Sequence, residues 1–466
     1  MLENMKKSPN YRWFVVAAVS IGTFMATLDS NIVNVAMPTL SGQFQTSLSL
    51  LQWVVTAYLL TITSLLPIFG RLADMLGSKK IYALGFLIFT TGSALCGLSP
   101  NLALLVAARV LQAIGASMLM SNSMAIVSAA FPPSSRGKAL GITGTVVALG
   151  SLTGPALGGI LIGVAGWRSI FFINVPIGIL GFVLALLILP ADQPRKGRET
   201  FDYGGAILFA SGMLSLLFAI NNGREQGWTS LSILLGLSAG AGLLIAFGFL
   251  ERKVRHPMID FSIFRNRTFL MGNLSGYLTF VAMFANTILL PFYLQQILHY
   301  PPSKIGLLMM ATPFIMAFVA PASGQASDKY GFVLLTSTGL AIMAAGLFYF
   351  STLSAGASFW QVLPGPILMG FGSGMFQSPN NTSVMNSVAP QKMGVAGSIN
   401  SLVRNLGMVT GIAFSVTLFE GLGGTAAPSS DQIPTFISAY HVVMLVAMMI
   451  ALFGMVISLN RKAGVA

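Results

Sequence analysis

The sequence predicts an all-α integral membrane protein with 14 transmembrane helices and both termini in the cytoplasm. Composition is the first reason, because 55% of the 466 residues are hydrophobic and only 8% are charged, whereas soluble proteins have about 25% charged residues. The second reason is that the apolar runs are about 20 residues long, which is enough to cross a bilayer as helices. The third is that Lys and Arg gather in alternate connections, as they do in cytoplasmic loops.

The expected spans follow one another along the chain with short connections. The first eight are expected at 13–36, 48–68, 81–98, 102–122, 138–163, 168–189, 203–221 and 231–250. The last six are expected at 269–292, 305–324, 332–351, 361–384, 395–419 and 436–459.

The basic residues set the expected orientation. With a cytoplasmic N-terminus, cytoplasmic segments hold 20 of the 25 Lys and Arg residues, and outer segments hold only Arg168, Arg224 and Lys304. The remaining two, Arg109 and Arg404, fall inside spans. One missed or invented helix would reverse half of the chain and remove this asymmetry, so the asymmetry supports the number of spans.

An internal repeat indicates two related halves. The stretches GRLADMLG (70–77) and GQASDKYG (324–331) share the pattern G-x-x-x-D-x-x-G, with Asp74 and Asp328 at the same place. Both follow an out-to-in span, and such repeats are common among transporters. We therefore expect an N-terminal six-helix bundle, an inserted pair of helices and a C-terminal six-helix bundle, with boundaries at 1–190, 191–267 and 268–466.

The first copy of the repeat is expected to form a cytoplasmic loop. Gly70 and Gly77 would allow tight turns there. Asp74 would cap the following helix or face its positive end, and Lys79 would reach lipid phosphates. The simpler alternative is an ordinary positively charged cytoplasmic loop.

A glycine pattern marks the fifth span, GSLTGPALGGILIG (150–163). Gly150, Gly154 and Gly158 recur every four residues and so share one helix face. Such a face lets another helix approach closely, and Pro155 favours a bend. Static packing of two helices would require the same pattern.

Two opposite charges are expected at the same depth in the membrane. Asp29 lies about nine residues before the outer end of the first span near Pro38, and Arg109 lies about eight residues after the outer start of the fourth span near Asn101. At about 1.5 Å per residue, both lie roughly 12 Å below the outer surface. An ion pair between them would offset the cost of burying either charge.

Six stretches in order resemble the major facilitator superfamily, and within it the fourteen-helix drug:proton antiporters. They are LDSNIVNVAMP (28–38), QWVVTAYLL (52–60), GRLADMLGSKK (70–80), RVLQAIGAS (109–117), GSLTGPALGG (150–159) and WRSIFFINVPIG (167–178). The resemblance implies the major facilitator fold, in which two six-helix bundles surround a central cavity. It also implies alternating access, with export driven by protons.

The resemblance also implies roles for particular residues. The family's loop motif matches Gly70, Asp74, Gly77 and Lys79, and its antiporter motif matches Gly150, Gly154, Pro155, Gly158 and Gly159. Its acidic residue in the first span matches Asp29, and its arginine in the fourth span matches Arg109. Met75 and Ser78 stand where the loop motif usually has basic residues, which reduces the charge of that motif.

Asp29 is the expected proton carrier, with Arg109 as its partner. Burial raises the pKa of a carboxyl group and a nearby guanidinium lowers it, so rearrangement between two states would change proton affinity. The alternative is a fixed ion pair that holds the first span to the fourth. Arg404 is expected to bind an anionic group or to exchange partners, or else to be a structural arginine that snorkels or binds backbone carbonyls.

The substrates are expected to be flat, lipophilic, cationic drugs. Aromatic side chains suit such molecules through cation–π contacts, although an aromatic residue in a span more often packs against a helix or faces lipid. The candidate substrate-binding residues are Trp53, Tyr58, Phe284, Phe292, Tyr293, Phe376, Gln377 and Asn380. The alternative function is a dedicated exporter or flippase of a lipid or endogenous metabolite.

Other classes of function are disfavoured. An enzyme is not expected, because no metal cluster or nucleophile–base constellation is visible, and neither a metal nor another cofactor is expected. The net charge of +13 is spread over short loops, so nucleic-acid binding is not expected. We expect a monomeric, multi-pass protein of the bacterial plasma membrane, whose partners are protons, drug-like substrates and membrane lipids.

Overall fold

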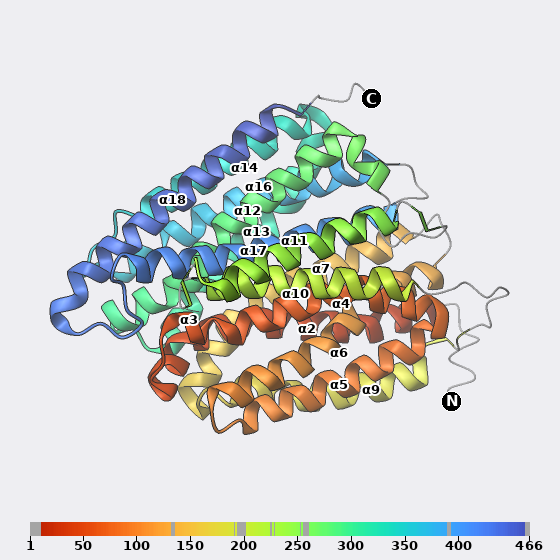
Figure 1. Ribbon diagram of the computed structural model, residues 1–466, viewed down its shortest axis with the longest axis horizontal. Helices are drawn as coiled ribbons and strands as arrows, with labels where there is room; N and C mark the ends of the chain where they lie inside the picture. The colour runs from red at the N-terminus through yellow and green to blue at the C-terminus, as the bar shows by residue number, and fades with distance from the viewer. Residues whose placement is uncertain are drawn as a thin grey trace. The chain divides into compact units, whose positions relative to one another are not determined.

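A computed structural model describes residues 11–131, 136–190, 192, 202–223, 226–227, 229–251, 253–254, 261–388 and 393–461. Every regular element in these ranges is helical (Figure 1). Twelve helices of the described chain are long and apolar enough to cross a membrane. The protein is therefore an all-helical chain with the composition of a membrane protein.

The contacts between residues divide the chain into two compact units. The first contains Met1–Ala36 and Trp53–Ser211, and the second contains Met37–Gln52 and Gly212–Ala466. The three divisions fall after Ala36, inside the first helix, after Gln52, and after Ser211, inside helix α10. The three-part domain organisation expected from the sequence stays a prediction.

The helices that begin in the first unit follow one another along the chain. They are α2 (Tyr11–Phe44), α4 (Trp53–Leu76), α5 (Ser78–Leu98), α6 (Leu102–Ala130), α7 (Arg136–Ala165), α8 (Ser169–Phe172), α9 (Asn174–Ile188) and α10 (Tyr203–Asn222). Asn101 caps the start of α6, because its side-chain oxygen accepts a hydrogen bond from the Leu104 N–H. Such a cap satisfies one of the free N–H groups of the first turn.

The second unit contains the remaining helices. They are α3 (Leu48–Leu51), α11 (Leu231–Glu251), η2 (Phe261–Arg265), α12 (Arg267–Phe292), η3 (Tyr293–Ile297), α13 (Pro302–Tyr330), α14 (Phe332–Phe350), α15 (Phe359–Val362), α16 (Pro364–Asn386), α17 (Met393–Gly421), η5 (Ser430–Gln432) and α18 (Ile433–Leu459). Asn266 caps α12 by accepting hydrogen bonds from the N–H groups of Thr268 and Phe269.

Each of the expected spans coincides with a helix. In α7 the described apolar part is the shorter Leu149–Ala165. Helix α16 is not among the twelve apolar helices, and it carries the polar run SPNNTS at 378–383. The number of 14 crossings and the cytoplasmic location of the termini stay predictions. Helix α2 continues eight residues past the expected end at 36, because Pro38 is accommodated inside the helix rather than ending it.

The two copies of the repeat have matching backbone geometry. The expectation of a loop at 70–77 was wrong, because Gly70 to Leu76 belong to α4 and only Gly77 leaves the helix, with φ of +107°. In the second copy, α13 continues to Tyr330 and Gly331 has φ of +81°. Positive φ favours glycine, which has no Cβ atom to clash. The side chains of Asp74 and Asp328 lie outside the described residues.

Asp192 caps the helix that follows the first copy. Its carboxylate accepts hydrogen bonds from the backbone N–H groups of Lys79 at 2.9 Å and Lys80 at 3.3 Å. The Lys79 ammonium donates to the carbonyl oxygens of Leu186 at 2.6 Å and Leu189 at 3.1 Å, at the end of α9. An acid at a helix start and a base at a helix end both complement the helix dipole.

The glycine face of α7, formed by Gly150, Gly154 and Gly158, packs against α2. A Cβ atom added at Gly154 would lie 2.8 Å from Asn31 Cβ, and one added at Gly158 would lie 2.7 Å from Ile32 Cγ1. These distances are shorter than any normal contact between carbon atoms, which is about 3.5–4.0 Å. The expected close approach of another helix is therefore confirmed, and its partner is the helix that carries Asp29.

The second unit repeats this packing between α17 and α12. A Cβ atom added at Gly407 would lie 2.7 Å from the Tyr277 carbonyl oxygen, and one added at Gly411 would lie 2.5 Å from that of Val281. Helices α7 and α17 thus use glycines in the same way, α7 against α2 and α17 against α12, each within its own unit. This similarity supports the internal repeat seen in the sequence.

A larger side chain on the glycine face should separate α7 from α2. We expect Gly154→Leu to destabilise the protein by about 1–3 kcal/mol through overpacking. Gly163→Leu is a matched control on the same helix, because a Cβ atom at Gly163 has nothing within 4 Å. Thermal unfolding of the two purified variants in detergent measures the difference. Equal melting temperatures would contradict the packing described here.

Candidate functional site

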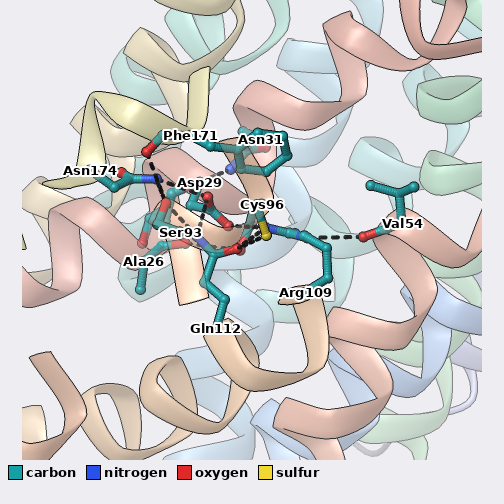
Figure 2. A network of polar contacts seen from close by, with 12 residues as sticks. Ala26, Asp29, Asn31, Val54, Ser93, Cys96, Arg109, Gln112, Phe171 and Asn174 are labelled. Carbon is teal, nitrogen blue, oxygen red and sulfur yellow. Dashed lines mark hydrogen bonds and ion pairs between the residues drawn. The ribbon is translucent and has the colours of Figure 1, made fainter. Parts of the chain in front are cut away.

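A buried ion pair joins α2 to α6 in the first unit. Arg109 Nη1 lies 2.5 Å from Asp29 Oδ2, and the side chains are 0% exposed for Asp29 and 1% exposed for Arg109. Figure 2 shows the carboxylate and the guanidinium pointing toward each other between the helices. The pairing expected from their equal depth is confirmed.

Three further side chains complete the Asp29 network, which we define as Asp29, Arg109, Gln112, Ser93 and Asn174 (Figure 2). Asp29 Oδ1 accepts hydrogen bonds from Gln112 Nε2 at 2.8 Å and from Asn174 Nδ2 at 3.0 Å. Both amides also donate to Ser93 Oγ at 3.0 Å. The carboxylate is therefore held by groups from α6 and α9, and Ser93 on α5 supports both amides.

Arg109 also binds two neutral acceptors. Its Nε donates to the Val54 carbonyl oxygen at 3.0 Å, and its Nη1 donates to Gln112 Oε1 at 2.6 Å. The guanidinium carbon lies 4.0 Å from the centroid of the Tyr58 ring, a distance at which cation–π attraction is effective. The arginine is thus fixed by α4 as well as by α2.

Local sequence explains how these groups meet. Gln112 follows Arg109 by three residues, so both side chains project from the same face of α6. Gly92 lets α5 approach this face, because a Cβ atom there would lie 2.5 Å from the Gln112 backbone nitrogen. That close approach brings the neighbouring Ser93 within hydrogen-bond distance of Gln112.

The two amides and the serine of this network were not predicted from the sequence. Helical spacing was a usable signal for Gln112, because it lies one turn after an intramembrane arginine. Asn174 lies within the motif WRSIFFINVPIG, but no charge or spacing marked it as a partner of Asp29. Ser93 carried no signal, because serine is common in membrane helices and its role here depends on the packing of α5 against α6.

The candidate substrate residues are distributed over both units. Trp53 begins α4, and Tyr58 lies beside Arg109. Phe284, Phe292 and Tyr293 are buried in the second unit, where the Tyr293 hydroxyl donates to the Ser354 carbonyl oxygen at 2.6 Å. Their part in substrate binding stays a prediction.

Three other candidates lie together around a small cavity in the second unit. The cavity has a volume of about 20 Å³ and lies among α12, α16 and α17. Its lining residues are Gly276, Phe280, Phe376, Gln377, Asn380, Asn381, Asn400, Val403 and Arg404. The structure thus places Arg404, which the sequence marked as an intramembrane charge, beside Phe376, Gln377 and Asn380.

Comparison with known proteins identifies the family. The family model described as "Major Facilitator Superfamily" matches residues 19–412. The chain belongs to the major facilitator superfamily. The chain resembles two solved structures in fold. One is a bacterial homologue of the human lysosomal transporter Spinster, at 16% identity, and the other is the POT family transporter PepTSo, at 15% identity. Each match has a TM-score of 0.67 and covers 97% of both chains.

Several similar members of the superfamily are named transporters. The riboflavin transporter RibZ of Clostridioides difficile is 41% identical over 411 residues, which cover 88% of each chain. The multidrug resistance protein Stp of Mycobacterium tuberculosis is 34% identical over 89% of this chain and 77% of the relative. The multidrug transporter protein MdtP of Bacillus subtilis is 31% identical over 92% of this chain and 80% of the relative. The chain is therefore a transporter of this superfamily and not an enzyme.

Removing the arginine alone should destabilise the folded transporter. Arg109→Gln leaves the Asp29 carboxylate buried without a cation, and we expect a loss of about 3–5 kcal/mol. The double variant Asp29→Asn/Arg109→Gln has no buried charge at this site, so it should regain most of that loss. Thermal unfolding of the two single variants, the double variant and the wild type gives the coupling energy. A double variant as unstable as the sum of both single variants would show that the pair does not couple.

Proposed function

We propose that the protein is a proton-coupled transporter in which Asp29 binds and releases the proton. The observation that supports this proposal is the buried Asp29–Arg109 pair, because ionisable residues inside membrane helices commonly mark proton or substrate pathways. Asp29 is fully buried, so a proton must reach it in a second conformation of the first unit. That requirement agrees with the alternating access expected from the resemblance to antiporters.

The hydrogen bonds around the pair would allow it to open. When Asp29 binds a proton, it loses its charge and its attraction to Arg109. Arg109 would keep its bonds to the Val54 carbonyl and to Gln112 Oε1, and Asp29 Oδ1 could still accept from Gln112 and Asn174. Neither side chain would be left without a partner, which limits the cost of separating buried ions. A fixed ion pair that only joins α2 to α6 is the competing interpretation.

Substitution of the carboxylate separates these interpretations. Asp29→Asn should abolish substrate-driven proton flux in liposomes that contain a pH dye. It should leave exchange of labelled for unlabelled substrate across the membrane intact, because exchange needs no net proton movement. In the fixed-pair interpretation, the substitution removes only the ion pair with Arg109 and leaves proton flux intact. A folded Asp29→Asn variant with normal proton flux would therefore rule out the proposed carrier role. Ser30→Ala, one position further along α2, serves as the control.

The substrate proposed first is a flat heterocyclic metabolite of the riboflavin type. The similarity to the riboflavin transporter supports it, because identity is 41% and the match covers the same share of both chains. The cavity in the second unit also offers four side-chain amides, on Gln377, Asn380, Asn381 and Asn400. Such groups suit the carbonyl and hydroxyl groups of riboflavin better than they suit an apolar cation.

Export of lipophilic drugs is the second candidate. The relatives named for multidrug resistance or transport support it, as does the glycine face GSLTGPALGG, which resembles the motif of antiporters. The two candidates share the proposed coupling through Asp29 and differ in the molecule carried.

One liposome experiment compares the two candidates. Purified protein is reconstituted with an internal pH dye, and riboflavin or ethidium is added in separate samples. We expect riboflavin to move and to change the internal pH, with ethidium giving little response. The reverse pattern would favour multidrug export, and protein-free liposomes give the background leak of each compound.

A further inference from the structure

Arg404 is an intramembrane cation that the proposed coupling site does not use. It lies on α17, within an apolar span, and its side chain is partly buried. Within the described part of the chain it forms no hydrogen bond or ion pair, and it lines the 20 Å³ cavity. Charged side chains inside membrane helices are costly and are normally paired. Arg404 is a cation without a protein partner, and it lies at a cavity. Such a cavity is expected to bind a negatively charged or electron-rich group.

Asn380 gives independent evidence that the cavity receives a polar group. Its side chain is 2% exposed and lines the cavity, yet its buried Oδ1 atom has no hydrogen-bond partner. Buried amides in proteins nearly always find partners, because a buried polar group without one loses the hydrogen bonds that water would supply. Asn380 Oδ1 is an acceptor that needs an N–H or O–H group, whereas Arg404 is a donor that needs an acceptor. Both residues line the same cavity.

The remaining walls of the cavity are suited to a flat group. Phe280 on α12 and Phe376 on α16 supply apolar surface, and Gly276 leaves space between them. Asn400 Nδ2 already donates to Asn381 Oδ1 at 3.0 Å, so this amide pair is partly satisfied. A volume of about 20 Å³ is close to that of one water molecule. The cavity therefore fits one functional group of a larger molecule, not the whole molecule.

The geometry points to a substrate subsite in which Arg404 binds a carboxylate or carbonyl oxygen of the transported molecule and Asn380 Oδ1 accepts a hydrogen bond from a neighbouring N–H or O–H group of that molecule. The inference rests on the proposed transport of a small aromatic compound and narrows its chemistry. A fixed positive charge attracts anions and repels cations in a medium of low dielectric constant. The subsite should thus select anionic or carbonyl-rich aromatic compounds over cationic ones of the same shape. A structural water molecule in the cavity is the competing interpretation.

Two dyes with the same ring system test the charge selection. Fluorescein is an anion near neutral pH and rhodamine 123 is a cation, and both contain a xanthene ring with a phenyl substituent. We expect the purified full-length protein in detergent to bind fluorescein more tightly, as measured by fluorescence anisotropy. Arg404→Gln should weaken fluorescein binding by about 10- to 100-fold, as loss of a charge-assisted hydrogen bond predicts. It should not weaken rhodamine 123 binding.

Two further variants separate binding from folding and from general charge effects. Gly276→Ala should fill part of the cavity without strain, because an added Cβ atom meets only Asn380 Nδ2, at 3.5 Å. It should therefore also weaken fluorescein binding while the melting temperature is retained. Arg168→Gln removes a positive charge in the first unit, where the guanidinium lies over Trp167, and should leave the binding of both dyes unchanged.

Several results would overturn the subsite. These are no saturable fluorescein binding by the wild type, equal affinity for the two dyes, or fluorescein affinity that stays within about twofold in both Arg404→Gln and Gly276→Ala. A structural water site would give the last result. Because binding is measured without a membrane potential or pH gradient, failure of proton coupling at Asp29 would leave these measurements unaffected, and the two proposals can fail separately.

Discussion

The first unit is organised around the need to keep a carboxylate and a guanidinium together where no water reaches them. Burying either ion alone would cost several kcal/mol, and Asp29 and Arg109 are both almost completely buried. One ion pair, and neutral hydrogen-bonding groups on each side of it, offset this cost. Helices α4, α5, α6 and α9 each contribute at least one of these groups. Four helices therefore contact the charged pair or the amides that hold it.

Helix α2 packs against different neighbours with its two opposite faces. Asp29 points toward α6 and α9, whereas Thr27 and Asn31 contact the glycine face of α7. These contact residues lie two positions from Asp29, which is about 200° around a helix. A change in the packing of α7 therefore acts on the face of α2 opposite to Asp29. This arrangement provides a direct mechanical link between the glycine face and the Asp29 network.

Much of the fold could be predicted from the sequence because apolar length and loop charge are local signals. The expected spans match helices closely, and the Asp29–Arg109 pair followed from rise per residue. The loop at 70–77 was mispredicted, because glycine at position 70 is tolerated inside a helix and only the position with positive φ ends it. The cap of α5 could not be found, since Asp192 is more than a hundred residues away in the chain. Long-range partners such as Asn174 and Ser93 became visible only when helix packing was known.

The contact between Gly77 and Asp192 has an evolutionary consequence. A Cβ atom at position 77 would overlap the Asp192 carboxyl group, and the backbone there has positive φ. Replacement of the glycine would displace the acid from the two N–H groups that it binds. Homologous chains that retain an acidic residue at position 192 should thus also retain glycine at position 77, whereas chains that have lost the acid are free to vary there within the limits of backbone strain. The two positions should show correlated substitution although they are far apart in the chain.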